Sequence, residues 1–148
     1  MKPQTCEWLK AANNDLIVIA EIIDNDLVTP AVAFHAQQCI EKCLKAVIEE
    51  FAPGVMKIHH LTVLYATAKA YLDLDFDHKI PLLETLDKLY IDSRYPGEFG
   101  LLPNGKPTLE DAREFYQFAR HIYTIVCDRL KSVEEEPPSQ APDESDTA

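Results

Sequence analysis

The sequence has little glycine, no long apolar run and no excess of basic charge. Only 4 of its 148 residues are glycine, which disfavours a fold rich in tight turns between strands. No apolar run approaches the roughly 20 residues that a membrane-spanning helix needs. The 14 basic residues are outnumbered by 25 acidic ones, so the chain carries no broad basic surface of the kind that binds nucleic acid unspecifically.

The motifs of common enzyme classes and metal sites are also missing. The chain has no glycine-rich dinucleotide or phosphate loop, no serine-hydrolase elbow and no HExxH zinc motif. Its four cysteines, Cys6, Cys39, Cys43 and Cys127, form no CxxC pair. His35 precedes Cys39 and Cys43 at helical intervals, but the three positions drift around a helix, so we expect packing thiols and no metal or other cofactor. Because no apolar leader opens the chain, we expect a cytoplasmic protein with reduced thiols and no membrane contact.

Helical periodicity dominates what the sequence does contain. Apolar residues make up 47% of the chain and recur every three to four positions in five segments. This spacing predicts helices over about 4–24, 29–51, 60–72, 80–95 and 108–133. Short connections make consecutive helices antiparallel. The predicted fold class is all-α, an up-and-down bundle of about five helices, four long and one short helix inserted between them.

Residues 1–133 are expected to form one helical domain, and residues 134–148 an acidic tail. The tail, EEEPPSQAPDESDTA, is rich in proline and has no large apolar side chain. It cannot bury enough surface to offset its conformational entropy, so we expect it to be disordered. Six acidic residues and no basic one follow Lys131, so residues 1–131 carry only −5 of the net charge of −11.

Capping and turn residues mark two of the expected helix boundaries. Thr29 and Pro30 are typical of the N-cap and the first helical position. Thr108 and Asp111 resemble a capping box with Asp in place of Glu. Between the last two long helices, residues 94–107 contain three prolines and three glycines, which predicts turns.

Residues 31–48 carry the most informative pattern in the chain. Their apolar side chains share one arc of a helix, while Gln38, Glu41, Lys42 and Lys45 fall on the opposite arc. Glu41 precedes Lys45 by four positions, the favourable order for an ion pair on a helix. Two lysines one turn apart also suit phosphate binding as point charges. The polar arc is therefore either a solvated charged surface or a functional site.

Asp15 lies at the edge of the apolar stripe of the first helix. An acid at that position is partly desolvated unless a base meets it, and Lys42 or Lys45 on the next helix is suitably placed. The plain interpretation is a flanking ion pair. The functional interpretation is that Asp15 forms one wall of a polar pocket.

Polar side chains also stand at the end of the fourth predicted helix and before the start of the third. Arg94 and Tyr95 stand directly before Pro96, where the arginine either complements the end of the helix dipole or lines the mouth of a groove. His59 and His60 precede the third helix, where histidines of a loop or cap are the plain interpretation.

In combination these segments resemble the HEPN family (higher eukaryotes and prokaryotes nucleotide-binding domain), of the prokaryotic stand-alone type. The resemblance covers about residues 5–131. It is carried by Trp8, Ala12, Asp15 and Leu16, by Ala33–Gln38 with Glu41, Lys42 and Lys45, by His60, Leu61 and Leu64, and by Tyr90 with Ser93–Pro96. It implies a bundle of about five helices and a homodimer.

The resemblance also implies two functional groups. One group binds nucleotide or partners a minimal nucleotidyltransferase. The other consists of metal-independent ribonucleases, often toxins, which use an arginine followed after four to six residues by a histidine. No arginine here has a histidine at that distance. Arg113 and His121 are eight positions apart and diverge by about 80° on a helix.

The resemblance therefore favours a non-catalytic protein that binds nucleotide or nucleic-acid phosphate in a groove between helices and partners a minimal nucleotidyltransferase. One alternative is an interaction or dimerisation module of a toxin–antitoxin pair, without a ligand. The other is a metal-independent RNA endonuclease with a divergent site. The expected ligand-binding residues are Asp15, Gln38, Glu41, Lys42, Lys45, His60, Arg94 and Tyr95, with no catalytic residue among them.

Overall fold

The computed structural model describes residues 1–54, 57–94 and 105–135, with residues 92–94 described by their backbone alone. Within these ranges the secondary structure is entirely helical, which confirms the all-α prediction. Single 3-10 turns, Asp26–Val28 and Asp77–Lys79, precede the second and fourth helices. The five helices are α1 (Pro3–Ile22), α2 (Thr29–Phe51), α3 (Leu61–Ala68), α4 (Ile80–Arg94) and α5 (Leu109–Glu135).

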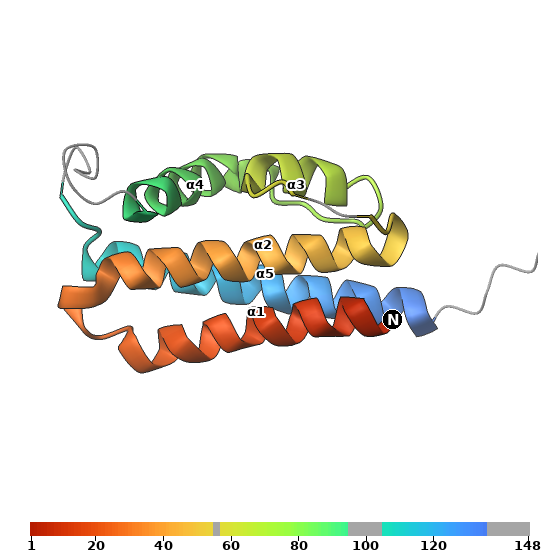
Figure 1. The fold of residues 1–148 in the computed structure, drawn as a ribbon, viewed down its shortest axis with the longest axis horizontal. Helices are drawn as coiled ribbons and strands as arrows, with labels where there is room; N and C mark the ends of the chain where they lie inside the picture. Colours follow the sequence, from red (N-terminus) through yellow and green to blue (C-terminus); the bar gives the residue numbers. More distant parts are fainter. Residues whose placement is uncertain (55–56, 95–104, 136–148) are drawn as a thin grey trace, which may run out of the picture.

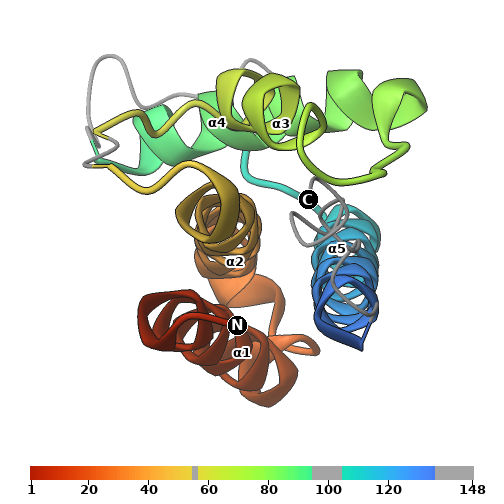
Figure 2. The same cartoon turned by 90° about the vertical axis from the view of Figure 1, so that its right-hand side faces the viewer.

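The helices form two layers. In Figure 1, α1, α2 and α5 lie along the long axis of the molecule, and α3 and α4 cover them on one side. In Figure 2, α1, α2 and α5 are seen end-on, whereas α4 extends across the view, so α4 crosses the first layer at an angle. The four long helices alternate in direction along the chain, as predicted for an up-and-down bundle, and the short α3 is inserted between α2 and α4.

Helix α2 occupies the centre of the bundle. It packs against α1, α3, α4 and α5. Its apolar arc supplies Ile40 and Leu44 to the core, where they meet the equally buried Ile19 of α1 and Ile122 of α5. Burial of each such side chain contributes about 2 kcal/mol. The opposite arc is covered as well, because no residue between Ala36 and Ile48 is exposed. The interpretation of that arc as a solvated charged surface is therefore wrong.

The start of α2 differs from the prediction. Val28 occupies the N-cap position and Thr29 is already helical. The Thr29 hydroxyl is buried and donates a hydrogen bond of 2.6 Å to the carbonyl of Pro107, which precedes α5. The threonine thus ties the α1–α2 turn to the start of the last helix instead of capping its own helix.

Helix α3 is shorter than predicted, because the chain after it turns back and packs on the helix. The Tyr65 hydroxyl accepts a hydrogen bond of 2.7 Å from the Phe76 amide and donates one of 2.7 Å to Asp77. Leu74 and Phe76 are buried, so the predicted acidic connection is a packed segment with an acidic outer side. Burial raises the pKa of Tyr65 to about 12, with the Asp77 carboxylate acting in the same direction.

At its far end, α5 continues to Glu135 and takes in the first two residues of the predicted tail. The rest of that tail, residues 136–148, lies outside the described residues, as do residues 95–104 of the predicted loop.

The capping box at the start of α5 is confirmed, and we expect its removal to lower the stability of the protein measurably. The Thr108 amide donates to Asp111 and the Asp111 amide donates to the Thr108 hydroxyl, both at 3.0 Å. We expect Thr108→Ala to lower the free energy of unfolding by about 1 kcal/mol, because it leaves a helical amide without an acceptor. Urea denaturation measures this. Thr124→Ala, on the exposed surface of the same helix, is the control; an equal loss there would contradict the capping role.

Candidate functional site

Asp15 of α1 anchors the first half of the candidate site. Its side chain is only 8% exposed, and each carboxylate oxygen has a cationic or imidazole partner from α2. Oδ2 accepts a hydrogen bond of 2.7 Å from the Lys42 ammonium, and Oδ1 lies 2.9 Å from Nδ1 of His35. The predicted pairing of Asp15 with a lysine of the second helix is therefore present. His35 joins it, although the sequence prediction left that residue out of the site.

Glu41 of α2 anchors the second half in a similar way. Its side chain is 6% exposed, and Oε1 lies 2.9 Å from Nδ1 of His59. Oε2 lies 3.7 Å from the Lys45 ammonium, which confirms the predicted pair one turn apart. Lys45 is itself buried, and its ammonium stands 5.5 Å from the centre of the Trp8 ring on α1. This cation–π contact replaces part of the hydration that the lysine loses.

Two glutamines of α2 connect this second pair to the neighbouring segment. The Gln38 amide donates to the Gln37 side chain at 2.7 Å, and Gln37 donates to the His59 carbonyl at 3.2 Å. We call this set of contacting side chains the polar seam: Asp15, His35, Gln37, Gln38, Glu41, Lys42, Lys45 and His59.

The polar seam satisfies its own buried groups and directs two imidazoles outward. Among the described residues, every buried side-chain nitrogen and oxygen has a hydrogen-bond partner. A carboxylate can only accept, so the histidine Nδ1 that faces it donates, and Nε2 is left on the far side of each ring. The His59 side chain is 56% exposed and that of His35 is 27% exposed. The two carboxylates and two ammonium groups cancel in charge, so the groups that can meet a ligand are the imidazoles, the Gln38 amide and the remaining donors of the partly exposed Lys42 ammonium.

The remaining predicted site residues do not join the seam. His60 is exposed at the N-cap position of α3, where its side chain makes no capping bond. The adjacent His59 takes the place that the prediction gave to His60. Arg94 is the last residue of α4 and its side chain is outside the description, while Tyr95 lies outside the described residues altogether.

The described cysteines and metal-ligand side chains are not arranged as a nucleophile or a metal centre. Cys39 and Cys43 are fully buried, and burial raises the pKa of the Cys43 thiol, so that thiol is not an activated nucleophile. No three His, Cys, Asp or Glu side chains of the described ranges gather as metal ligands would.

The arginines and the histidine of the last helix also point to different neighbours. The His121 ring packs edge-on against Phe76, with centroids 5.8 Å apart, whereas Arg120 stacks over Tyr116 at 5.2 Å. Arg113 lies 3.4 Å from Asp24 of the α1–α2 turn. Arg113 and Arg120 therefore have contacts of their own that His121 does not share, in agreement with the divergence of Arg113 from His121 on the helical wheel.

Comparison with known proteins now identifies the family. Residues 5–131 match the HEPN domain family. The chain belongs to the HEPN domain family. A curated protein of Methanocaldococcus jannaschii, named "Putative toxin", is 30% identical to this HEPN protein over 137 residues, and the alignment covers 84% of this chain and 86% of the relative. Among solved structures none matches this HEPN protein. None of the helices described for it is both long and apolar enough to cross a membrane.

Proposed function

We propose that this HEPN protein binds the phosphate groups of a nucleotide or nucleic acid along the polar seam without cleaving them, and that it acts in a toxin–antitoxin pair with a minimal nucleotidyltransferase as its partner. The observation that carries the ligand proposal is the pair of carboxylate-held imidazoles. Asp15 and Glu41 fix His35 and His59 by Nδ1, so each Nε2 is oriented outward in advance of binding. An imidazole protonated at both nitrogens donates from Nε2 to a phosphate oxygen while Nδ1 keeps its bond to the carboxylate, and a ring already held in place costs less ordering entropy when the phosphate binds.

The lysines of the seam have a supporting part in this proposal. Lys42 and Lys45 each face a carboxylate, so neither is a free counter-charge for phosphate. They hold the acids in place, and Lys42, whose side chain is 23% exposed, retains donors for a ligand that arrives beside His35. The cavity of about 30 Å³ beside Trp8 and Lys45 holds no more than a water molecule. A ligand would therefore lie along the seam and not inside the bundle.

The toxin–antitoxin setting has a separate basis. The relative from Methanocaldococcus jannaschii carries the name of a toxin. The nucleotidyltransferase partner and the homodimer are suggested by the resemblance to the family. The absence of the arginine–histidine spacing and the divergence of Arg120 from His121 support binding without cleavage.

Asparagine substitutions test the seam without removing its internal bonds. The asparagine amide nitrogen stands close to where histidine Nδ1 stands, so His35→Asn with His59→Asn keeps a donor toward each carboxylate and deletes both Nε2 atoms. We expect this variant to bind ATP and a short RNA about tenfold more weakly, a loss of about 1.4 kcal/mol. Fluorescence anisotropy with labelled RNA and the ATP-induced rise in melting temperature measure it.

The matched control replaces two exposed histidines outside the seam, His78→Asn and His121→Asn. An equal loss in the control would assign the effect to general surface charge. If neither ATP nor RNA at millimolar concentration stabilises the unmodified protein, the ligand proposal is wrong. Metal-independent cleavage of the RNA would instead favour the endonuclease alternative.

A further inference from the structure

A groove opens on the other side of the bundle, between α4 and α5. Helix α4 packs on α2 and α3, and α5 packs on α1 and α2, whereas the backbones of α4 and α5 stand further apart within the part of the chain that the structure describes. The space between them is a cavity of about 510 Å³. A second hollow of about 310 Å³ adjoins it, sharing the lining residues Leu82, Thr85 and Glu114.

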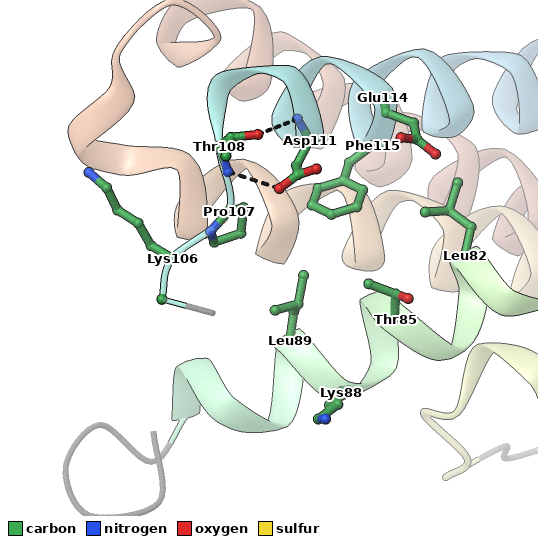
Figure 3. Close-up of a pocket in the computed structure, with 11 residues that line it drawn as sticks. Leu82, Thr85, Lys88, Leu89, Lys106, Pro107, Thr108, Asp111, Glu114 and Phe115 are labelled. Carbon is green, nitrogen blue, oxygen red and sulfur yellow. Dashed lines mark hydrogen bonds between the residues drawn. The ribbon is translucent and has the colours of Figure 1, made fainter. Parts of the chain in front are cut away.

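The floor of this groove is apolar. Figure 3 shows Leu82 and Leu89 pointing from α4 toward Phe115 of α5. Leu82 and Leu89 are only partly buried, although they pack against the core. They are seven positions apart, so they lie on one stripe of α4, two turns from each other. An apolar stripe of this kind is the recognition surface for the apolar face of a helix.

The rims of the groove carry opposite charges. Lys79 and Lys88 stand on the α4 side, and Asp111 and Glu114 on the α5 side, where Lys106 also lines the groove but donates its ammonium to the Asp26 carbonyl. Asp111 is engaged in the capping box. Lys88 and Glu114 have no ion-pair partner among the described residues, although they border the same cavity. A basic rim facing an acidic one favours a ligand whose two flanks carry the complementary charges.

We propose that the α4–α5 groove binds an amphipathic helix of a partner protein. Its apolar stripe would lie on Leu82, Leu89 and Phe115, with acidic residues on the flank that faces α4 and basic residues on the flank that faces α5. The lining from Lys79 to Leu89 extends about 15 Å along α4, which is the length of about three helical turns. The partner helix therefore presents anchors at positions i, i+4 and i+7. This proposal does not depend on phosphate binding by the polar seam.

A photo-crosslinker placed in the groove tests the proposal in cells that produce the full chain. Benzoylphenylalanine replaces Thr85, which is exposed and lines the groove. Its matched control replaces Thr124, which is also an exposed threonine of a long helix and lines a different hollow, between α1 and α5. After irradiation, mass spectrometry identifies the segment joined to each position. We expect position 85, and not position 124, to capture a helix of another protein with the stated apolar stripe and charged flanks.

Charge reversal on the rims completes the test. Lys88→Glu and Glu114→Lys are each expected to lower the yield of that crosslink several-fold, because each places a like charge against one flank of the partner helix. Capture of a second copy of this chain, of another segment of the same chain such as 95–104 or 136–148, or of no protein at all would overturn the proposal. So would a captured segment that lacks the charge pattern. The RNA affinity of the Lys88→Glu variant is expected to stay unchanged, which separates this result from the test of the polar seam.

Discussion

Replacing Lys42 with methionine is expected to lower the free energy of unfolding by about 2 kcal/mol, because it removes the charged one of the two hydrogen-bond partners that the structure shows for the largely buried Asp15 carboxylate. The charge left behind is that of Asp15, which sits in the interface between α1 and α2 with its Oδ2 atom 2.7 Å from the Lys42 ammonium. Methionine retains the length and the apolar stem of lysine, so packing changes little. Urea denaturation of the purified protein, followed by circular dichroism, measures the loss.

Two further variants separate the buried charge from other effects. Adding Asp15→Asn to Lys42→Met removes the uncompensated charge, and we expect it to restore most of the lost stability. Lys69→Met breaks the Lys69–Asp77 pair, in which both side chains are largely exposed, and is expected to cost less than about 1 kcal/mol. If Lys42→Met were as mild as Lys69→Met, Asp15 would have to be solvated, contrary to its position in the structure.

Replacing Asp87 with alanine is expected to cost about 2 kcal/mol, because it leaves a buried helical amide without an acceptor. Asp87 belongs to α4, and both of its carboxylate oxygens lie 3.0 Å from the first amide of α3, that of Leu61. The contact caps α3 from a neighbouring helix and joins the two helices of the second layer. Asp87→Asn keeps one acceptor oxygen, so we expect it to lower the free energy of unfolding by less than Asp87→Ala does. Thermal unfolding of both variants measures the difference.

The stability difference between the unmodified protein and Asp87→Asn also depends on pH. Burial raises the pKa of the Asp87 carboxyl, although bonds from the Leu61 and Thr62 amides oppose the shift. The folded chain therefore binds this proton more readily than the unfolded chain does. The contribution of Asp87 to stability is then largest at low pH and falls as the pH rises through the pKa of the folded state. Urea denaturation between pH 3.5 and 6 measures it; a difference that grows with rising pH would contradict the assigned direction.

The helical bundle could be predicted from the sequence because periodicity and capping residues act locally. Five apolar stripes at helical spacing gave the number of helices and their order, and Thr108 with Asp111 marked the start of α5 within one residue. The end of α3 could not be predicted in this way. It depends on the Tyr65 hydroxyl, which holds Phe76 and Asp77 eleven and twelve positions later and thereby packs the connection onto the helix.

The candidate site was predicted only in part, for a similar reason. A helical wheel finds the polar arc of α2 but carries no information on what covers it. His59 enters that arc from the segment before α3, and Trp8 and Asp15 enter it from α1. The sequence spacing could have placed His35 in the site, because His35 precedes Lys42 by seven positions and therefore lies on the same stripe of the helix. The choice between His59 and His60 depends on the backbone of a non-helical segment, which the sequence pattern does not specify.

The central position of α2 limits how its sequence can change. Helices α1, α4 and α5 each have an exposed side on which a substitution alters little beyond solvation. From Ala36 to Ile48, α2 has no such side, since even its least buried members, Gln38 and Lys42, contact other side chains. A substitution at almost any of these positions must be matched by a change in another helix. We therefore expect random mutagenesis to tolerate fewer single replacements in α2 than in any other helix of the protein, and to recover changes there mainly as coupled pairs.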